Sequence, residues 1–393
     1  MFSKSIANLY RNGLNSTKVL QNVICKRNLY EPAALGLDKY QYYREKLSSQ
    51  YSDVDKQTFL ERMQSFAIPE STSLIFTEDL KQIVHMIDDN EVELKLVEQM
   101  MKKFNQQNKG LRFGNFTFGP VVMRMFYHLN KPDFALKMFY EPELEGFFNH
   151  LTSYQILMDL LFINGKYDEI LSAYKTIQER QLQIAKFPKG VMMLVFAACY
   201  KLNTAESFEY ACKLWTEQQE AGHIPIRKTV TFFAANALNQ NSPHIAIEVL
   251  STVRNQVYVT LRNIKVVALC DLGRIHDALP ILRSVLSLDR PSDSFNNAVK
   301  QTFCRDVIDI VKSTAEKQES KEISLELERI LSQFEELNII SETTLDSILC
   351  TDVKMVERPV NNNYQDNMVA ASYGNSRPYK KREYRRPGIS DML

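Results

Sequence analysis

Apolar residues recur at intervals of three and four along most of the chain, in segments short enough to be single helices. Tyr154, Leu157, Leu160 and Leu161 are typical, because this spacing places them on one face of a helix. The segments come in pairs that are separated by polar turns. This pattern predicts an all-α protein built from helical hairpins.

Five of the pairs share a glycine or an asparagine where the first helix ends. These residues stand 35, 38, 38 and 32 positions apart. A helix commonly ends with one residue in the left-handed region, which Gly and Asn adopt at the lowest cost. A second position supports the register, since an alanine stands early in four of the five second helices. The five turn residues are Asn130, Gly165, Asn203, Asn241 and Gly273.

This register predicts an α-solenoid of stacked helix-turn-helix repeats over residues 77–293. A helical lead-in, residues 31–76, would precede the array, and capping helices within residues 294–350 would cover its open end. The apolar spacing marks one capping helix from Val299 to Val311 and another from Ile323 to Phe334. The predicted units are 77–112, which is the most degenerate, then 116–150, 151–185, 189–226, 227–258 and 259–293.

Composition agrees with this fold and excludes several classes of protein. Only 12 of 393 residues are glycine, which argues against a β-sandwich or barrel with its many turns. The longest apolar run, residues 191–200, is too short for a membrane span, which needs about 20 residues. The six cysteines form no CxxC pair, so neither a disulfide framework nor a zinc site is expected.

The two ends of the chain are basic, although the net charge is only +1. Residues 1–30 carry +5 and no acidic residue, a composition typical of a mitochondrial transit peptide, and Arg27 suggests processing near residue 30. The alternative is a frayed basic first helix. Residues 351–393 lose the apolar periodicity and are predicted to be a disordered basic tail. Its lysines and arginines, interleaved with Tyr379 and Tyr384, suit either RNA contact or simple solvation.

The sequence carries no pattern of catalytic chemistry. It has no HExxH, no GxxxxGK[ST], no GxGxxG and no Cys/His spacing for a metal. We therefore expect no enzyme activity, no cofactor, no metal and no small-molecule substrate.

Two segments resemble the pentatricopeptide repeat. Residues 152–183, TSYQILMDLLFINGKYDEILSAYKTIQERQLQ, match one unit with Gly165 as the turn glycine, and residues 221–226, AGHIPI, reproduce its Gly-x-x-Pro-x ending. The tetratricopeptide repeat, whose period is about 34 residues, fits less well. Only one of the five positions where it wants a small residue in the first helix holds one.

Residues 110–350 further resemble, in order and with the same offsets, one group of animal mitochondrial members of the pentatricopeptide repeat family. This resemblance implies an RNA-binding protein of the mitochondrial matrix. Such a protein would support maturation of mitochondrially encoded transcripts, and through them the respiratory chain. Its implied partners are single-stranded mitochondrial RNA and, as a further possibility, RNA-processing or ribosomal proteins.

The resemblance also implies which residues would contact RNA. In the family the fifth residue of a unit, paired with the last, reads one base. Polar side chains fill three fifth positions here, and the Asn263–Asp293 pair would favour uracil. Lys201 stands just before a turn, where the family often has a phosphate-binding lysine, and Lys166 and Arg274 stand one residue past a turn. The three polar fifth residues are Gln155, Thr231 and Asn263.

The alternative is that all of these residues are ordinary solvent-exposed helix residues that do not contact RNA. Residues 31–376 carry a net charge of −8, so bulk electrostatics would not hold RNA. A protein-binding adaptor or assembly factor in the matrix, for example on the ribosome, is therefore the second hypothesis. A positive groove through Lys201, Arg262 and Lys265 would favour RNA, and an acidic or apolar groove would favour a protein partner.

Overall fold

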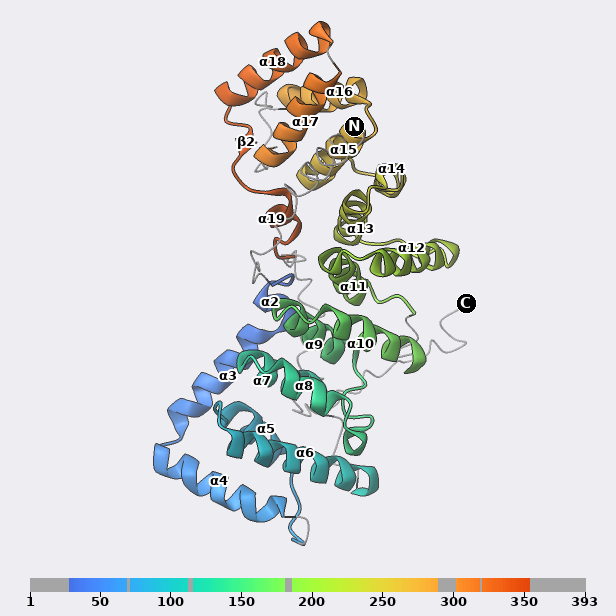
Figure 1. Cartoon of the computed structure of the whole chain (residues 1–393). Helices are drawn as coiled ribbons and strands as arrows, with labels where there is room; N and C mark the ends of the chain where they lie inside the picture. Colours follow the sequence, from blue (N-terminus) through green and yellow to red (C-terminus); the bar gives the residue numbers. More distant parts are fainter. Residues whose placement is uncertain are drawn as a thin grey trace, which may run out of the picture.

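The computed structural model describes residues 28–68, 71–111, 116–180, 186–288, 302–318 and 320–353. Within them the chain is a stack of eight helical hairpins, which confirms the predicted all-α fold (Figure 1). The first helices of the hairpins are α3 (Leu37–Gln50), α5 (Thr77–Met86), α7 (Gly119–His128), α9 (Leu151–Ile163), α11 (Lys189–Leu202), α13 (Arg227–Asn239), α15 (Val259–Asp271) and α17 (Arg305–Lys317). The second helices are α4 (Asp53–Ala67), α6 (Glu91–Leu111), α8 (Pro132–Phe139), α10 (Tyr167–Arg180), α12 (Ala205–Glu220), α14 (Pro243–Ser251), α16 (Ile275–Leu288) and α18 (Lys321–Glu336).

The five predicted turn residues adopt the left-handed conformation. Gly165 and Gly273 have φ angles of 72° and 70°, and Asn130, Asn203 and Asn241 have φ angles between 50° and 52°. In the first of these turns the backbone N–H groups of Asn130 and Lys131 donate back to carbonyls of the preceding helix. The glycine and asparagine spacing therefore marked the true ends of five first helices.

Replacing Gly165 by alanine is expected to lower the free energy of unfolding by about 1 kcal/mol. A Cβ atom at this position would meet nothing within 4 Å, so the cost arises from the positive φ alone. Asparagine tolerates this region better, and Gly165→Asn should cost less. Urea denaturation of the two variants would measure both effects, and equal stability of the alanine variant and the wild type would contradict the argument.

The hairpins stack so that consecutive first helices contact each other from α3 through to α17. Their apolar faces form two adjoining clusters of buried side chains that meet at α15. The predicted lead-in thus supplies the hairpin α3–α4, and the predicted caps supply the hairpin α17–α18. Both belong to the same stack as the repeats between them.

The first capping helix begins later than its apolar spacing predicted, at Arg305. The two residues before it are extended as strand β1 (Phe303–Cys304), which pairs in parallel with β2 (Ile340–Ser341). Cys304 donates its backbone N–H to the Asn263 side chain of α15 at 2.9 Å, which holds this backbone away from a helical path.

Two segments leave the stack and cross the first helices. One is residues 28–35, which ends in α2 (Pro32–Leu35), and the other is residues 344–353, which contains α19 (Leu345–Leu349). We call the two segments together the inner strap, and the face of the first helices beneath them the inner face. Helix α2 contacts α9, and α19 contacts α13 and α15. Figure 1 shows α2 and α19 on the side of the first helices away from α12 and α14.

The two parts of the strap join each other. Tyr30 and Val353 form a parallel β-bridge, in which the Val353 N–H donates to the Leu29 carbonyl at 2.9 Å. These residues are more than 300 positions apart in the chain. The strap therefore closes the inner face along the middle of the stack. A short 3-10 helix, η2 (Pro142–Leu144), completes the described elements.

Candidate nucleic-acid interface

The three polar fifth-position residues lie on first helices but offer little surface. Asn263 is 0% exposed and Thr231 is 1% exposed, while Gln155 is half-buried. The Thr231 hydroxyl donates to the Lys228 carbonyl of its own helix at 2.9 Å. Asp293, the proposed partner of Asn263, lies outside the described residues.

Asn263 holds the chain's own backbone. Its amide nitrogen donates to the Thr302 carbonyl at 3.2 Å and to the Val259 carbonyl at 2.8 Å. Its amide oxygen accepts the N–H of Cys304 at 2.9 Å. The donor and the acceptor that would read a uracil are therefore both engaged in joining α15 to β1.

The predicted phosphate contacts are already paired with acids. Lys201 lies 2.6 Å from a carboxylate oxygen of Asp346 in the strap, and the Tyr200 hydroxyl donates to the same oxygen at 3.0 Å. The other two pairs are Lys166 with Asp133 and Arg274 with Asp277, each at 2.6 Å.

The predicted positive groove on the inner face is interrupted. Lys201 is neutralised by Asp346, Arg262 is only 9% exposed, and Lys265 is half-buried. The structure thus places the predicted RNA-reading residues on one row of helices, but the inner strap and β1 cover that row in its middle and last hairpins.

A different basic surface lies where the first helices begin. Helices α7, α9, α11, α13 and α15 all lack an acidic residue in their first turn, and α11 and α13 begin with Lys189 and with Arg227–Lys228. The N-terminus of a helix carries partial positive charge, so these cations add to a field that attracts anions. We call Lys189, Arg227 and Lys228 the basic edge.

Two of the three basic-edge cations are exposed. Among the described residues Lys189 and Arg227 form no salt bridge, and the Arg227 guanidinium stacks 3.2 Å from the centre of the Tyr258 ring. Burial lowers the pKa of Lys228 to about 8, and its ammonium donates to the Thr351 carbonyl at 2.7 Å. The sequence analysis did not predict this edge, although two successive first helices, α11 and α13, begin with Lys or Arg and lack acids in their first turn.

Comparison with known proteins gives close relatives. A zebrafish protein, mitochondrial pentatricopeptide repeat-containing protein 2, is 30% identical over 327 residues, which cover 83% of this chain and 81% of its own length. The chain belongs to the family of mitochondrial pentatricopeptide repeat-containing protein 2. The mouse member is 30% identical over 277 residues, or 70% of each chain, and the Xenopus laevis member is 27% identical over 326 residues.

Membership in this family supports a mitochondrial location for the chain, since the relatives are named as mitochondrial proteins. No protein-family model matches the chain.

The described residues of this family member hold one unusual carboxyl group. Asp159 lies in the middle of α9 and is 0% exposed. Burial raises its pKa to about 7, against hydrogen bonds from Tyr127 and from the backbone of Leu29 and Tyr30 that lower it. No functional residue predicted from the sequence lies at this position.

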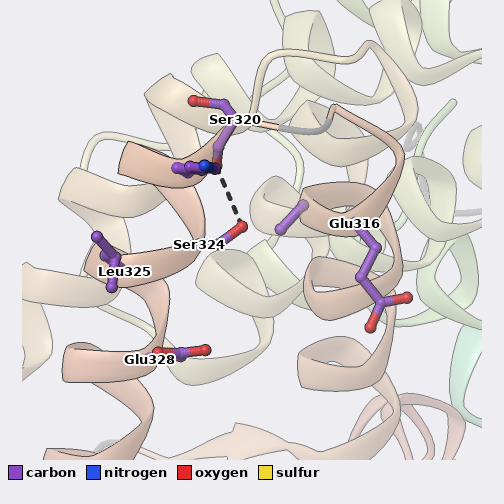
Figure 2. Close-up of a pocket in the computed structure, with 7 residues that line it drawn as sticks. Glu316, Ser320, Ser324, Leu325 and Glu328 are labelled. Carbon is purple, nitrogen blue, oxygen red and sulfur yellow. Dashed lines mark hydrogen bonds between the residues drawn. The ribbon is translucent and has the colours of Figure 1, made fainter.

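Other kinds of site find little support within the described part of the chain. It contains no group of three His, Cys, Asp or Glu side chains that would hold a metal ion, and no helix in it is both long and apolar enough to cross a membrane. A shallow pocket of about 350 Å³ lies between α17 and α18 (Figure 2). The Ser324 hydroxyl of α18 donates to the carbonyl of Ser320, the N-cap of this helix, and none of the predicted RNA contacts lines the pocket.

Proposed function

We propose that this chain is an RNA-binding protein of the mitochondrial matrix that supports maturation of mitochondrially encoded transcripts, and through them the respiratory chain, without enzyme activity of its own. Its family membership supports an RNA partner, because pentatricopeptide repeat proteins bind single-stranded RNA. The observation that carries the proposal is the basic edge, where exposed cations stand at the starts of neighbouring first helices.

RNA binding at this edge would rest on phosphate contacts and stacking. Lys189 and Arg227 would each neutralise a phosphate, and they stand at the starts of α11 and α13, which are neighbours in the stack. The Arg227 guanidinium covers one face of the 39% exposed Tyr258 ring, so a base would stack on the outer face of this exposed guanidinium. Contacts of this kind bind RNA with little sequence preference, so specificity would come from short stretches or from a protein partner.

Ultraviolet crosslinking of the tagged protein in intact mitochondria, followed by sequencing of the recovered RNA, tests the proposal. Discrete peaks on a few mitochondrial transcripts are expected, and they should be lost in a Lys189→Glu, Arg227→Glu variant. Lys39→Glu, Lys46→Glu reverses two exposed lysines on α3 and is the matched control. A chain ending at residue 376 tests the contribution of the basic tail. If no RNA is recovered above the level of an untagged control, the proposal is contradicted.

The Lys189→Ala, Arg227→Ala variant is expected to change the salt dependence of RNA binding. Each lost phosphate contact lowers the slope of log affinity against log salt by about 0.7 for a single strand, so the double variant should lose about 1.4. Fluorescence anisotropy with a labelled RNA at several salt concentrations measures this slope. Lys166→Ala, Arg274→Ala should leave the slope unchanged, because each of these cations already pairs with an acid.

A protein-binding adaptor is the second candidate, and the covered inner face favours it. The strap engages Lys201 and Lys228, and β1 engages Asn263. These side chains of the inner face are therefore not available to contact RNA bases or phosphates. If crosslinking recovers no RNA, the partner would be sought among ribosomal and RNA-processing proteins of the matrix by cofractionation with the ribosome.

A further inference from the structure

Asp159 is a buried carboxyl group that has no cationic partner among the described residues. One of its oxygens accepts the backbone N–H of Leu29 at 3.3 Å, and the other accepts the Tyr127 hydroxyl at 2.9 Å. Within the described residues no lysine, arginine or histidine forms an ion pair with it. A buried carboxylate is unfavourable unless it is paired as well as hydrogen-bonded. Within the described residues the ionised form of Asp159 therefore has no counter-ion.

The backbone of Leu29 is fixed at this site from several directions. Its side chain is 0% exposed, and its carbonyl accepts the Val353 N–H at 2.9 Å. The next residue, Tyr30, donates its hydroxyl to the Gly190 carbonyl at 2.8 Å. Asn28, by contrast, is only half-buried. Among the described residues Leu29 is thus the first that the fold fully encloses, and its N–H donates to Asp159.

We propose that residues 1–28 are removed by cleavage of the Asn28–Leu29 bond, so that the new α-ammonium group of Leu29 becomes the buried counter-ion of Asp159. The proposal rests on the mitochondrial import that belongs to the proposed function. A processing endopeptidase would cut the imported chain before it folds, since Leu29 is enclosed afterwards. Hydrolysis adds the hydroxyl of water to the Asn28 carbonyl carbon and its proton to the Leu29 nitrogen, which takes up a second proton to become the ammonium.

The position of the cut follows from the geometry. An ammonium group on Leu29 would replace a neutral N–H that already lies 3.3 Å from the carboxylate. A cut one residue earlier would move the charge about 3.8 Å along the chain, to half-buried Asn28. A cut one residue later would remove the buried leucine and the donor together. The basic, acid-free segment that ends at Arg27 stands immediately before this bond.

The first test is the N-terminus of the mature protein. The chain, tagged at its C-terminus, would be purified from mitochondria and its N-terminal peptide identified by mass spectrometry after labelling of free amines. The expected first residue is Leu29. Any other first residue in the mature protein would overturn the proposal.

The second test asks whether the ammonium pairs with Asp159. Asp159→Asn is made in two chains, one beginning with a free amine at Leu29 and one that keeps residues 1–28. In the chain that begins at Leu29 the substitution should lower the Tm by about 5 °C, because it breaks a buried ion pair. In the longer chain it should leave the Tm unchanged or raise it, because it removes an unpaired buried charge.

A matched control separates charge from hydrogen bonding. Tyr127→Phe removes a neutral donor to the same carboxyl group and should lower the Tm in both chains, whichever first residue the chain has. Equal shifts for Asp159→Asn in the two chains would overturn the pairing. Neither measurement involves RNA, so failure here is distinguishable from failure of the RNA-binding proposal.

Discussion

Replacing Asn263 by alanine is expected to lower the free energy of unfolding of the C-terminal hairpin by about 3 kcal/mol. The substitution leaves the N–H of Cys304, a residue that is 0% exposed, without its acceptor. It also removes a donor to the Thr302 carbonyl. An unsatisfied buried donor costs about 1–3 kcal/mol, and the lost side chain leaves a small cavity. Urea denaturation, with hydrogen exchange of α17, would measure the loss.

Asn164→Ala is the matched control for this prediction. Asn164 also donates its amide within the fold, to the Asn130 side chain and to the Leu160 carbonyl, but the Asn130 contact is exposed and water can replace it. This variant should lose less than about 1 kcal/mol. If Asn263→Ala instead kept full stability and lost RNA crosslinks, Asn263 would be a base-reading residue and its role in joining α15 to β1 would be negligible.

The ends of the repeat helices were predictable because they depend on local conformation. A left-handed residue such as Asn203 or Gly165 is selected by the cost of a positive φ at that single position, whatever packs around it. The all-α fold follows for the same reason, since the apolar period and the turns repeat at a regular distance. These properties need no knowledge of distant contacts.

The covering of the inner face was not predictable because it depends on contacts between distant parts of the chain. Tyr30 meets Val353, and Lys201 meets Asp346, although nothing in the local sequence of either partner indicates the other. Asn263 illustrates the consequence. An asparagine at a fifth position has the donor and acceptor to read a base, and it has the same groups to hold a backbone strand. Only the fold distinguishes the two roles.

The charge of the surface was predictable only as a total. The net charge of −8 over residues 31–376 argued against bulk attraction of RNA. The stack, however, brings Lys189 and Arg227 onto neighbouring first helices, although they are 38 positions apart in sequence. A mildly acidic protein can therefore carry a local basic edge, and the edge becomes visible when residues are compared at the same position of successive repeats.

In the chain that keeps residues 1–28, Asp159 is expected to make stability fall as the pH rises. Its folded pKa of about 7 lies above the ordinary value of 3.8, so the folded state binds a proton that the unfolded state has released between these two pH values. The stabilisation that this bound proton gives the folded state is complete below the unfolded pKa and is lost as the pH rises to about 7. With about 1.4 kcal/mol for each pKa unit, the loss is on the order of 4 kcal/mol.

The difference in unfolding free energy between this chain and its Asp159→Asn variant isolates the effect from all other titrating groups. Between pH 5 and pH 8 the unfolding free energy of the asparagine variant should rise relative to that of the wild type, because the variant lacks a charge that burial disfavours. The chain that begins at Leu29 should behave in the opposite way. Its ammonium group favours the charged carboxylate, so at pH 7 the asparagine variant should have a lower unfolding free energy than the wild type. A difference independent of pH in the longer chain would mean that Asp159 is charged there already, and that its hydrogen bonds with Tyr127 and Leu29 suffice to hold the charge.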